Sequence, residues 1–309
     1  MTQALRESRE DTYPTRRPDG ESWNERRDPV VWSNWTPEAP LTRAQTDSFE
    51  RNGFLVLENI FGPGEVTLLK QELERIRSGE KVVDRESLIT EPGSDEIRTV
   101  FQLEKQSAVF DRLSRDARVA GVIRFLLGDD LYIHQSRLNY KPGFTGKEFY
   151  WHSDFETWHA EDGMPGMRAI SASVLLTDND AMNGPLMLIP GSHKTFVSCA
   201  GETPDDNHRN SLKKQEVGVP SHETLSRMAG RHGLEYAAGK AGTVILFDCN
   251  TLHGSNGNIT PFPRSNAFFV YNAWSNRSVA PFAAAKPRPE FLGTHDPAAP
   301  LTIERGKLA

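Results

Sequence analysis

Two histidines and an aspartate in this chain have the residue types and the spacing of a metal site. His152 and Asp154 form an HxD pair inside the aromatic-rich run FYWHSDF, and His253 follows about a hundred residues later. Two imidazoles and one carboxylate bind a divalent metal and leave three coordination positions open. This ligand set suits non-haem Fe(II) in an oxygenase, where a cosubstrate and O₂ both need a place on the metal.

An HxD pair taken alone is weak evidence. The chain has nine histidines, so such pairs also arise by chance, and His159 with Glu161 forms a second pair of the same spacing. If the aromatic run is a strand, His152 and Asp154 project from one face of it. A hydrogen-bonded strand histidine is the alternative interpretation of His152. We expect His159 and Glu161 to be non-ligands in a polar loop after the strand.

An arginine after the second histidine supports an oxygenase site. Arg264 stands eleven residues past His253, at the entry to the run NAFFVYNAW. A 2-oxo acid that chelates iron through its keto and C1-carboxylate groups leaves its distal carboxylate to be held. Arginine binds a carboxylate through two parallel charge-assisted hydrogen bonds, so Arg264 is the expected anchor. A surface ion pair is the alternative role for Arg264.

The elements that position these residues change in type along the chain. Helical patterns occupy 42–53, 62–79 and 116–128, and each ends at a glycine. From residue 131 the period changes to two, and short apolar runs alternate with Gly, Pro and Asn turns. This order predicts an α+β protein whose β part is a sandwich or a jelly-roll barrel.

The first strand of that region, 131–140, mixes apolar and polar residues on one face. Gln135, Arg137 and Asn139 share this face with Leu131 and Ile133. Such a face suits a strand that lines a polar pocket. An edge strand with one solvent-exposed face is the alternative.

Composition excludes several classes of protein. The net charge is −6, which argues against a nucleic-acid binder, and no apolar run approaches the ~20 residues that cross a bilayer. The N-terminus lacks the apolar stretch of a secretory signal. Cys199 and Cys249 lack CxxC spacing, so we expect small buried side chains and no disulfide framework. A reducing cytoplasm is the expected location.

The chain is expected to form one domain preceded by an arm. Residues 1–40 are polar and rich in Arg and Pro, without periodicity, and they predict an extended arm anchored by tryptophans. A disordered tail is the alternative. Residues 41–309 form the single domain. A polar stretch near 195–240 predicts a long surface insertion or lid, whose three histidines should be solvent-exposed.

These residues resemble a known family. The HxD pair, the later histidine and the arginine eleven residues beyond it resemble the phytanoyl-CoA dioxygenase branch of the Fe(II)/2-oxoglutarate oxygenases, as does the opening LTRAQTDSFERNGFLVLENIF. The stretch FYWHSDFETWHAEDGMPGMRAISASVLLTDNDAMNGPLMLIPGSHK resembles the signature of bacterial ectoine hydroxylases. The similarity extends from about residue 25 to 300. Asp154 argues against a halogenase of this fold, in which a small residue replaces that carboxylate.

The resemblance implies a double-stranded β-helix core, jelly-roll or cupin-like, with flanking N-terminal helices. It implies an enzyme that converts ectoine, 2-oxoglutarate and O₂ into 5-hydroxyectoine, succinate and CO₂, and it suggests a homodimer. The iron ligands would be His152, Asp154 and His253. Contacts to 2-oxoglutarate would come from Phe149, Asn139, Ser171, Ser255 and Arg264. Contacts to ectoine would come from Gln135, Thr157, Trp158 and Arg288.

The side chains expected to contact the substrate suit its charges, but three other functions of the protein remain open. Trp158 suits a position over the cationic ring of ectoine, with core packing as its alternative, and Arg288 suits the substrate carboxylate. The same oxygenase chemistry on another small amino-acid derivative is the first rival. A non-enzymatic jelly-roll binding module is the second. A zinc hydrolase is the third, and it would leave Arg264 without a purpose.

Overall fold

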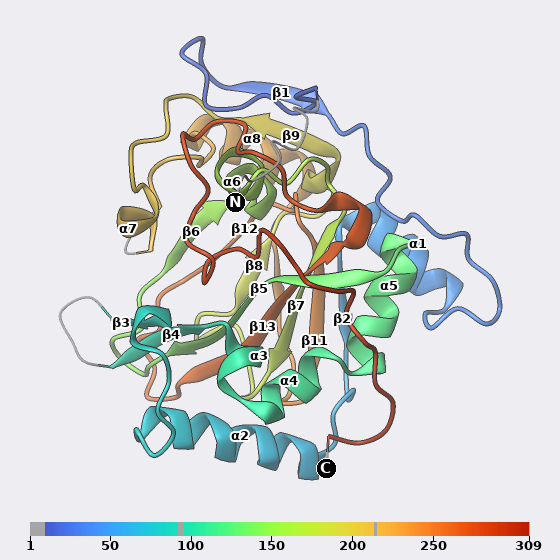
Figure 1. The fold of residues 1–309 in the computed structure, drawn as a ribbon, viewed down its shortest axis with the longest axis vertical. Helices are drawn as coiled ribbons and strands as arrows, with labels where there is room; N and C mark the ends of the chain where they lie inside the picture. Colours follow the sequence, from blue (N-terminus) through green and yellow to red (C-terminus); the bar gives the residue numbers. More distant parts are fainter. Residues whose placement is uncertain (1–9, 92–95, 213–214, 309) are drawn as a thin grey trace.

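The computed structural model describes residues 10–91, 96–212 and 215–308. Two antiparallel sheets face each other, and helices lie around the larger one (Figure 1). In spatial order the larger sheet contains β2 (Phe54–Leu57), β11 (Val244–Asp248), β7 (Ala169–Leu175), β13 (Arg264–Ala273), β5 (Leu131–Lys141), β4 (Ile97–Phe101) and β3 (Leu88–Thr90). The smaller sheet contains β10 (Glu235–Ala237), β8 (Leu186–Leu188), β12 (His253–Ser255) and β6 (Phe149–His152).

The helices complete the predicted α+β arrangement. The α-helices are α1 (Arg43–Asn52), α2 (Pro63–Arg77), α3 (Leu103–Gln106), α4 (Ala108–Ser114), α5 (Val122–Leu127), α6 (Asp154–Asp162), α7 (His208–Ser211) and α8 (His222–His232). Single turns are η1 (Arg85–Ser87), η3 (Ser192–Lys194) and η4 (Trp274–Asn276), and η2 (Ala117–Gly121) is a π-helical turn. The third predicted helix is thus divided into η2 and α5. Within the described residues, no helix is both long and apolar enough to cross a membrane.

The larger sheet is buried on both faces and divides the core in two. In β11, Val244 and Leu246 pack on the side of the helices, whereas Ile245 and Phe247 pack on the other side with Leu188 of the smaller sheet. Successive strand residues point to opposite faces, so this is the period of two that the sequence predicts. The same alternation aims polar residues of β5, β7 and β13 into the space between the sheets.

The first helix follows its predicted capping signals. The Thr42 side chain accepts from the backbone N–H of Gln45, and the Gln45 side chain accepts from the N–H of Thr42, which completes a capping box. Gly53 ends α1 in the left-handed conformation at φ 78°. Its backbone oxygen then accepts hydrogen bonds from Asp248 and Thr251, so the cap also fixes the end of β11.

The described part of the arm, residues 10–40, pairs with the beginning of the insertion. Strand β1 (Ser22–Glu25) forms a two-stranded antiparallel sheet with β9 (Thr195–Ser198), and the Trp23 indole donates to Thr224 Oγ1 at 2.9 Å (Figure 1). The insertion contains more regular structure than its sequence indicates, because α8 buries Thr224 and Met228, one helical turn apart. His222 and His232 are exposed as expected, whereas His208 is half-buried. Cys199 and Cys249 are buried and free.

Candidate active site

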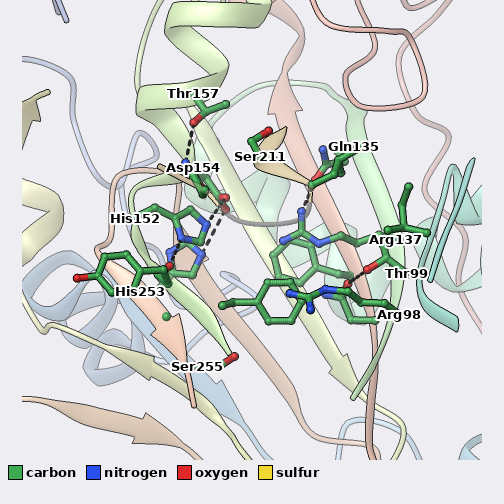
Figure 2. Close-up of a pocket in the computed structure, with 18 of the residues that line it drawn as sticks. Arg98, Thr99, Gln135, Arg137, His152, Asp154, Thr157, Ser211, His253 and Ser255 are labelled. Carbon is green, nitrogen blue, oxygen red and sulfur yellow. Dashed lines mark hydrogen bonds and ion pairs between the residues drawn. The ribbon is translucent and has the colours of Figure 1, made fainter. Parts of the chain in front are cut away.

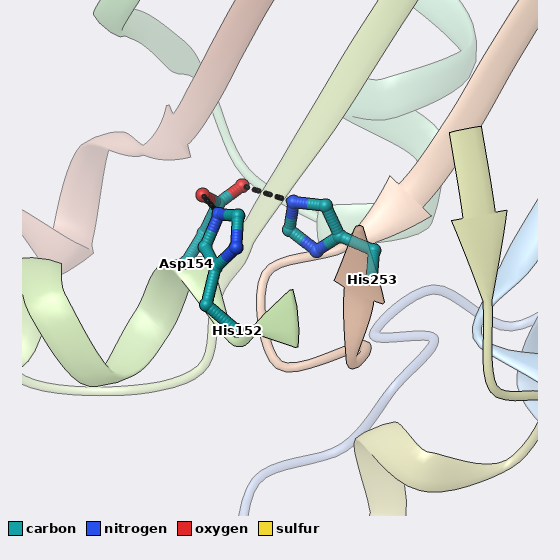
Figure 3. A group of neighbouring side chains, drawn as sticks. All are labelled: His152, Asp154 and His253. Carbon is teal, nitrogen blue, oxygen red and sulfur yellow. Dashed lines mark ion pairs between the residues drawn. The ribbon is translucent and has the colours of Figure 1, made fainter. Parts of the chain in front are cut away.

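The three predicted ligands converge where the two sheets face each other. His152 ends β6 and is the cross-strand partner of His253, which begins β12, while Asp154 begins α6. One ligand atom from each residue lies within 4.8 Å of the others (Figure 3). The carboxylate oxygens of Asp154 lie 3.5 Å from Nε2 of His152 and 3.9 Å from Nε2 of His253.

Hydrogen bonds set both imidazoles in the tautomer that a metal needs. Nδ1 of His152 lies 2.7 Å from the Tyr150 carbonyl oxygen, and Nδ1 of His253 lies 2.9 Å from the Thr251 carbonyl oxygen. A carbonyl only accepts, so each Nδ1 carries the proton and each Nε2 lone pair points at the centre. Two imidazole nitrogens and one carboxylate oxygen, with room for further ligands beside them, fit a divalent metal such as Fe(II).

The charges of the centre also fit a cation. Burial alone would raise the pKa of Asp154, but His253, His152 and Arg137 outweigh it and hold this pKa well below its usual range. Burial, together with His152, lowers the pKa of His253 to about 4. The carboxylate is therefore ionised and His253 is neutral at pH 7, as ligands must be. Ser171 Oγ donates to Asp154 at 3.3 Å and orients the carboxylate.

The local geometry differs from the expected strand. Strand β6 stops at His152, and Asp154 is the first residue of α6, so the pair converges through a strand end and a helix start. The prediction that His159 and Glu161 lie in a polar loop is wrong, since both are buried in α6. The helix forms because acidic residues occupy its first turn and Gly163 caps its end in the left-handed conformation.

One cavity of about 410 Å³ opens onto this centre between the two sheets (Figure 2). Most of the predicted contact residues line it: Gln135, Asn139, Phe149, Thr157, Trp158, Ser255, Arg264 and Arg288, together with the three ligands. Ser171 lies behind Asp154 instead. In Figure 2, Thr157 and Ser255 lie on opposite sides of the triad, which gives the cavity two distinct ends.

The Arg264 end of the cavity carries uncompensated positive charge. Arg264 is buried, its Nε has no hydrogen-bond partner among the described residues, and burial lowers its pKa to about 10. Its cross-strand partner is Lys141, whose Nζ donates to Ser255 Oγ at 2.9 Å. Burial, together with Arg264 and Arg98, lowers the pKa of Lys141 to about 6, so this amine is mostly neutral at pH 7. Arg264 stays charged, and a buried cation of this kind needs an anion. Asn139 completes this end, with its Oδ1 held by Thr99 at 3.2 Å.

At the other end, Arg288 is already paired. Its Nε and Nη2 donate to the two oxygens of Asp162 at 2.8 and 2.5 Å, and His134 lies 3.1 Å from the same carboxylate. Trp158 is 2% exposed and belongs to the hydrophobic cluster between the sheets, while it also lines the cavity. Trp158 therefore packs in the core, as the alternative interpretation predicted, and its contact with ectoine remains a proposal.

Sequence reasoning did not assign a role to Arg137. This side chain projects from β5 between Gln135 and Asn139, lies over the Phe268 ring at 4.1 Å and donates to Gln135 Oε1 (Figure 2). Within the described parts of the chain, no carboxylate lies within ion-pair distance of its guanidinium. The signal was present, because Arg137 shares the alternating polar face of its strand.

Facing antiparallel sheets that hold two histidines and one carboxylate define a double-stranded β-helix protein with the metal site of the non-haem oxygenases. The model of the family Phytanoyl-CoA dioxygenase (PhyH) matches residues 49–266. The chain belongs to this family, and within it to the ectoine dioxygenases. An ectoine dioxygenase from Sphingopyxis alaskensis is 57% identical over 299 residues, which cover 97% of this chain and 98% of the relative.

Solved structures agree with the family. The crystal structure of EctD from S. alaskensis with 2-oxoglutarate and 5-hydroxyectoine gives a TM-score of 0.90 at 53% identity, and the match covers 97% of this chain and 100% of that chain. The structure of the same protein with bound Fe gives a TM-score of 0.87 at 52% identity and the same coverage. The predicted family and jelly-roll core are thereby confirmed.

Proposed function

We propose that the protein hydroxylates ectoine to 5-hydroxyectoine, with conversion of 2-oxoglutarate and O₂ to succinate and CO₂. The observation that carries this proposal is the convergence of the triad and the unpaired Arg264 on one cavity with a second, polar end. The relatives named ectoine dioxygenases, which match nearly the full chain, support ectoine as the substrate. Another small amino-acid derivative is the second candidate, and a cavity of this size also accommodates it.

In the proposed site, His152, Asp154 and His253 hold Fe(II), and the bound metal supplies the activation of O₂ for C–H hydroxylation. Arg264 holds the distal carboxylate of 2-oxoglutarate through paired hydrogen bonds. Ser255, Asn139 and Phe149 surround that cosubstrate, whereas Ser171 acts from behind Asp154, whose carboxylate it orients. Because Lys141 donates to Ser255 Oγ, the serine proton is free to point toward the carboxylate.

Ectoine occupies the end of the cavity formed by α6 and β5. Gln135, Thr157, Trp158 and Arg288 contact it, and we add Arg137 to this set because it is a half-buried cation on the same strand face as Gln135. The chain contributes placement, which holds one C–H bond of the ring toward the metal and thereby fixes the position of hydroxylation. Residues of the insertion that line the cavity exclude water from it. Whether the insertion moves as a lid stays a prediction, as do the cytoplasmic location and a homodimer.

The test is anaerobic loading with Fe(II) and 2-oxoglutarate, followed by O₂ with ectoine, with proline or with neither. We expect succinate and 5-hydroxyectoine in equal amounts, and only with ectoine. Succinate that depends on another substrate would keep the oxygenase and reject ectoine. Iron-loaded protein that forms neither product would favour a binding module. Activity that zinc supports without O₂ would favour a hydrolase.

A further inference from the structure

One arginine of the N-terminal arm is buried against the helix that carries Asp154. Arg16 has a fully buried side chain, and its Nε and Nη2 donate to the two oxygens of Glu156 at 3.0 and 2.9 Å. Its Nη1 donates to Glu161 at 2.6 Å. Both carboxylates belong to α6 and are themselves buried, so they share a single cation from the arm.

The same guanidinium reaches the insertion. Nη1 of Arg16 also donates to Thr203 Oγ1 at 2.8 Å, and the backbone N–H of Arg16 donates to the carbonyl of Cys199 at 2.8 Å. Asn207 of the insertion donates to the Glu161 oxygen that Arg16 binds, at 2.8 Å. The Arg16 guanidinium and its partners therefore join three segments that are distant in sequence: the arm, α6 and residues 199–212.

The energetics of this cluster point to a specific role. Burying three charged groups carries a large desolvation penalty, and apolar side chains of similar volume would stabilise the same contact at least as well. Arg16 also adopts φ 55°, a left-handed backbone that a non-glycine residue rarely occupies. Opposite the cluster, a Cβ at Gly218 would lie 2.0 Å from Glu156 Oε2, so the chain is packed directly against it.

The cluster adjoins the residues proposed to contact ectoine. Glu156 precedes Thr157 in α6, and Glu161 and Asn207 themselves line the cavity. Thr157 Oγ1 accepts a hydrogen bond at 3.2 Å from Gln215, which also lines it. Figure 2 shows Thr157 with Ser211 above the triad, away from the Ser255 side where 2-oxoglutarate is proposed to bind.

We propose that Arg16 is a positioning residue for ectoine. It clamps α6 to residues 199–212, so that the wall of the cavity formed by Thr157, Glu161 and Asn207 is preformed and dry when ectoine binds. Among the described residues, no hydrogen bond of Arg16 reaches the Arg264 end of the cavity. The inference rests on the proposed function, because it assigns the arm a part in recognising the substrate of that reaction.

The test compares Arg16→Gln, Arg16→Lys and Thr203→Val with Tyr13→Phe as the control. Thr203→Val removes one bond between the clamp and the insertion and leaves those of Cys199 and Asn207 in place. Tyr13→Phe removes a hydroxyl of the arm that donates to Asp28 at 2.9 Å and accepts from the backbone N–H groups of Arg27 and Asp28. Arg16 makes no hydrogen bond to this hydroxyl. For each protein the KM for ectoine, the KM for 2-oxoglutarate, the ratio of hydroxyectoine to succinate and the melting temperature are measured.

For Arg16→Gln we expect the KM for ectoine to rise about tenfold or more, because a small misplacement of a binding wall has effects of that order. The KM for 2-oxoglutarate should change less than about twofold, and hydroxyectoine should fall below succinate. Thr203→Val should also raise the KM for ectoine and lower the ratio of hydroxyectoine to succinate, but by less. Arg16→Lys should have smaller effects on these two quantities than Arg16→Gln. Tyr13→Phe should lower the melting temperature and leave the KM for ectoine and the ratio of hydroxyectoine to succinate unchanged.

Several outcomes overturn the proposal. A folded Arg16→Gln protein with the wild-type KM for ectoine and equal products would do so. So would parallel losses for ectoine and 2-oxoglutarate that Tyr13→Phe reproduces. If Arg16→Gln does not fold, unchanged ectoine readouts in Thr203→Val overturn it. Wild-type protein that forms no hydroxyectoine rejects the proposed function and this inference together, whereas active wild type with an unaffected Arg16→Gln rejects this inference alone.

Discussion

Two arginines in the cavity have opposite surroundings, and these match two different ligands. Burial alone acts on Arg264 and lowers its pKa to about 10. Burial would also lower the pKa of Arg288, but Asp162 outweighs it and raises this pKa. An uncompensated guanidinium suits a dianion such as 2-oxoglutarate. A guanidinium that already has a carboxylate suits a zwitterion such as ectoine, because the Arg288–Asp162 pair itself needs no further counter-ion.

Arg264→Gln should therefore separate the two ligands. Loss of a paired, charge-assisted contact costs about 3 kcal/mol, so the KM for 2-oxoglutarate should rise ~100-fold. The KM for ectoine should stay within about twofold of wild type. Arg288→Gln is the matched variant and should show the reverse pattern. Steady-state kinetics with each ligand varied in turn measures both, and equal increases for the two ligands in Arg264→Gln would exclude the anchor role.

The first and last residues of α6 are both buried aspartates, and they allow a matched comparison. Asp154→Ala should lose iron and lower succinate formation by at least ~100-fold, because two imidazoles alone hold Fe(II) weakly. Asp162→Asn should keep its iron and raise the KM for ectoine, because Arg288 loses its counter-ion. Iron content after anaerobic loading and desalting is measured beside turnover. Wild-type turnover in Asp154→Ala would refute the ligand assignment.

Helix α6 shows where prediction from sequence stops. The types and spacing of His152, Asp154, His253 and Arg264 identified the centre, because those properties are local or depend only on residue identity. The helix itself was missed, since every residue from Asp154 to Asp162 except Thr157 is buried and no apolar stripe marks a solvent-facing side. An all-buried helix of nine residues has no periodic signature.

The ion pairs that hold α6 were also beyond sequence reasoning. Arg16 and Glu156 are separated by 140 residues, and no local pattern relates a charge in a polar arm to one in the site helix. By contrast, α1 and the alternating polar face of β5 were predicted, because helix caps and strand periods depend on residues that are close together in the sequence.

Two helix-ending glycines allow the packing of α1 to be tested. Gly53 and Gly79 have nearly the same left-handed φ, 78° and 76°. A Cβ at Gly79 would meet nothing within 4 Å, whereas a Cβ at Gly53 would lie 2.3 Å from Nδ1 of His193 and 2.7 Å from Oγ1 of Thr251. Gly79→Ala should cost about 1 kcal/mol of unfolding free energy, from the backbone alone.

Gly53→Ala should cost about 3 kcal/mol, because overpacking adds to the backbone strain. Urea unfolding of the two variants against wild type measures both values. Similar losses of unfolding free energy in the two variants would mean that the residues around Gly53 shift to accept a methyl group at little cost.

For the molecule as a whole, a buried histidine limits stability in acid. His193 contacts the carbonyl of Glu50 at 3.2 Å, and burial lowers its pKa to about 4, although Asp248 opposes this shift. In the unfolded chain the pKa is about 6.5, so below that pH the unfolded state binds a proton that the native state excludes. The contribution of His193 to the unfolding free energy is therefore complete above about pH 6.5 and is lost as the pH falls toward 4.

At pH 5 this single group should reduce the unfolding free energy by about 2 kcal/mol. Urea unfolding at pH 7.5 and pH 5 measures the loss in wild type, and His193→Gln should lose about that much less between the two pH values. The comparison cancels the other titrating groups, because both proteins share them. Identical losses in the two proteins would show that His193 is protonated in the native state.

The order of strands in the larger sheet has a consequence for biosynthesis. Strand β13 lies in the middle of this sheet, between β7 and β5, yet it is the last strand of the described chain (Figure 1). Until Ala273 has left the ribosome, β5 and β7 present unpaired edges toward each other, and such edges recruit strands of other chains. A product that ends before Arg264 should therefore appear in the insoluble fraction, and a slow final segment of translation would lower the yield of native protein.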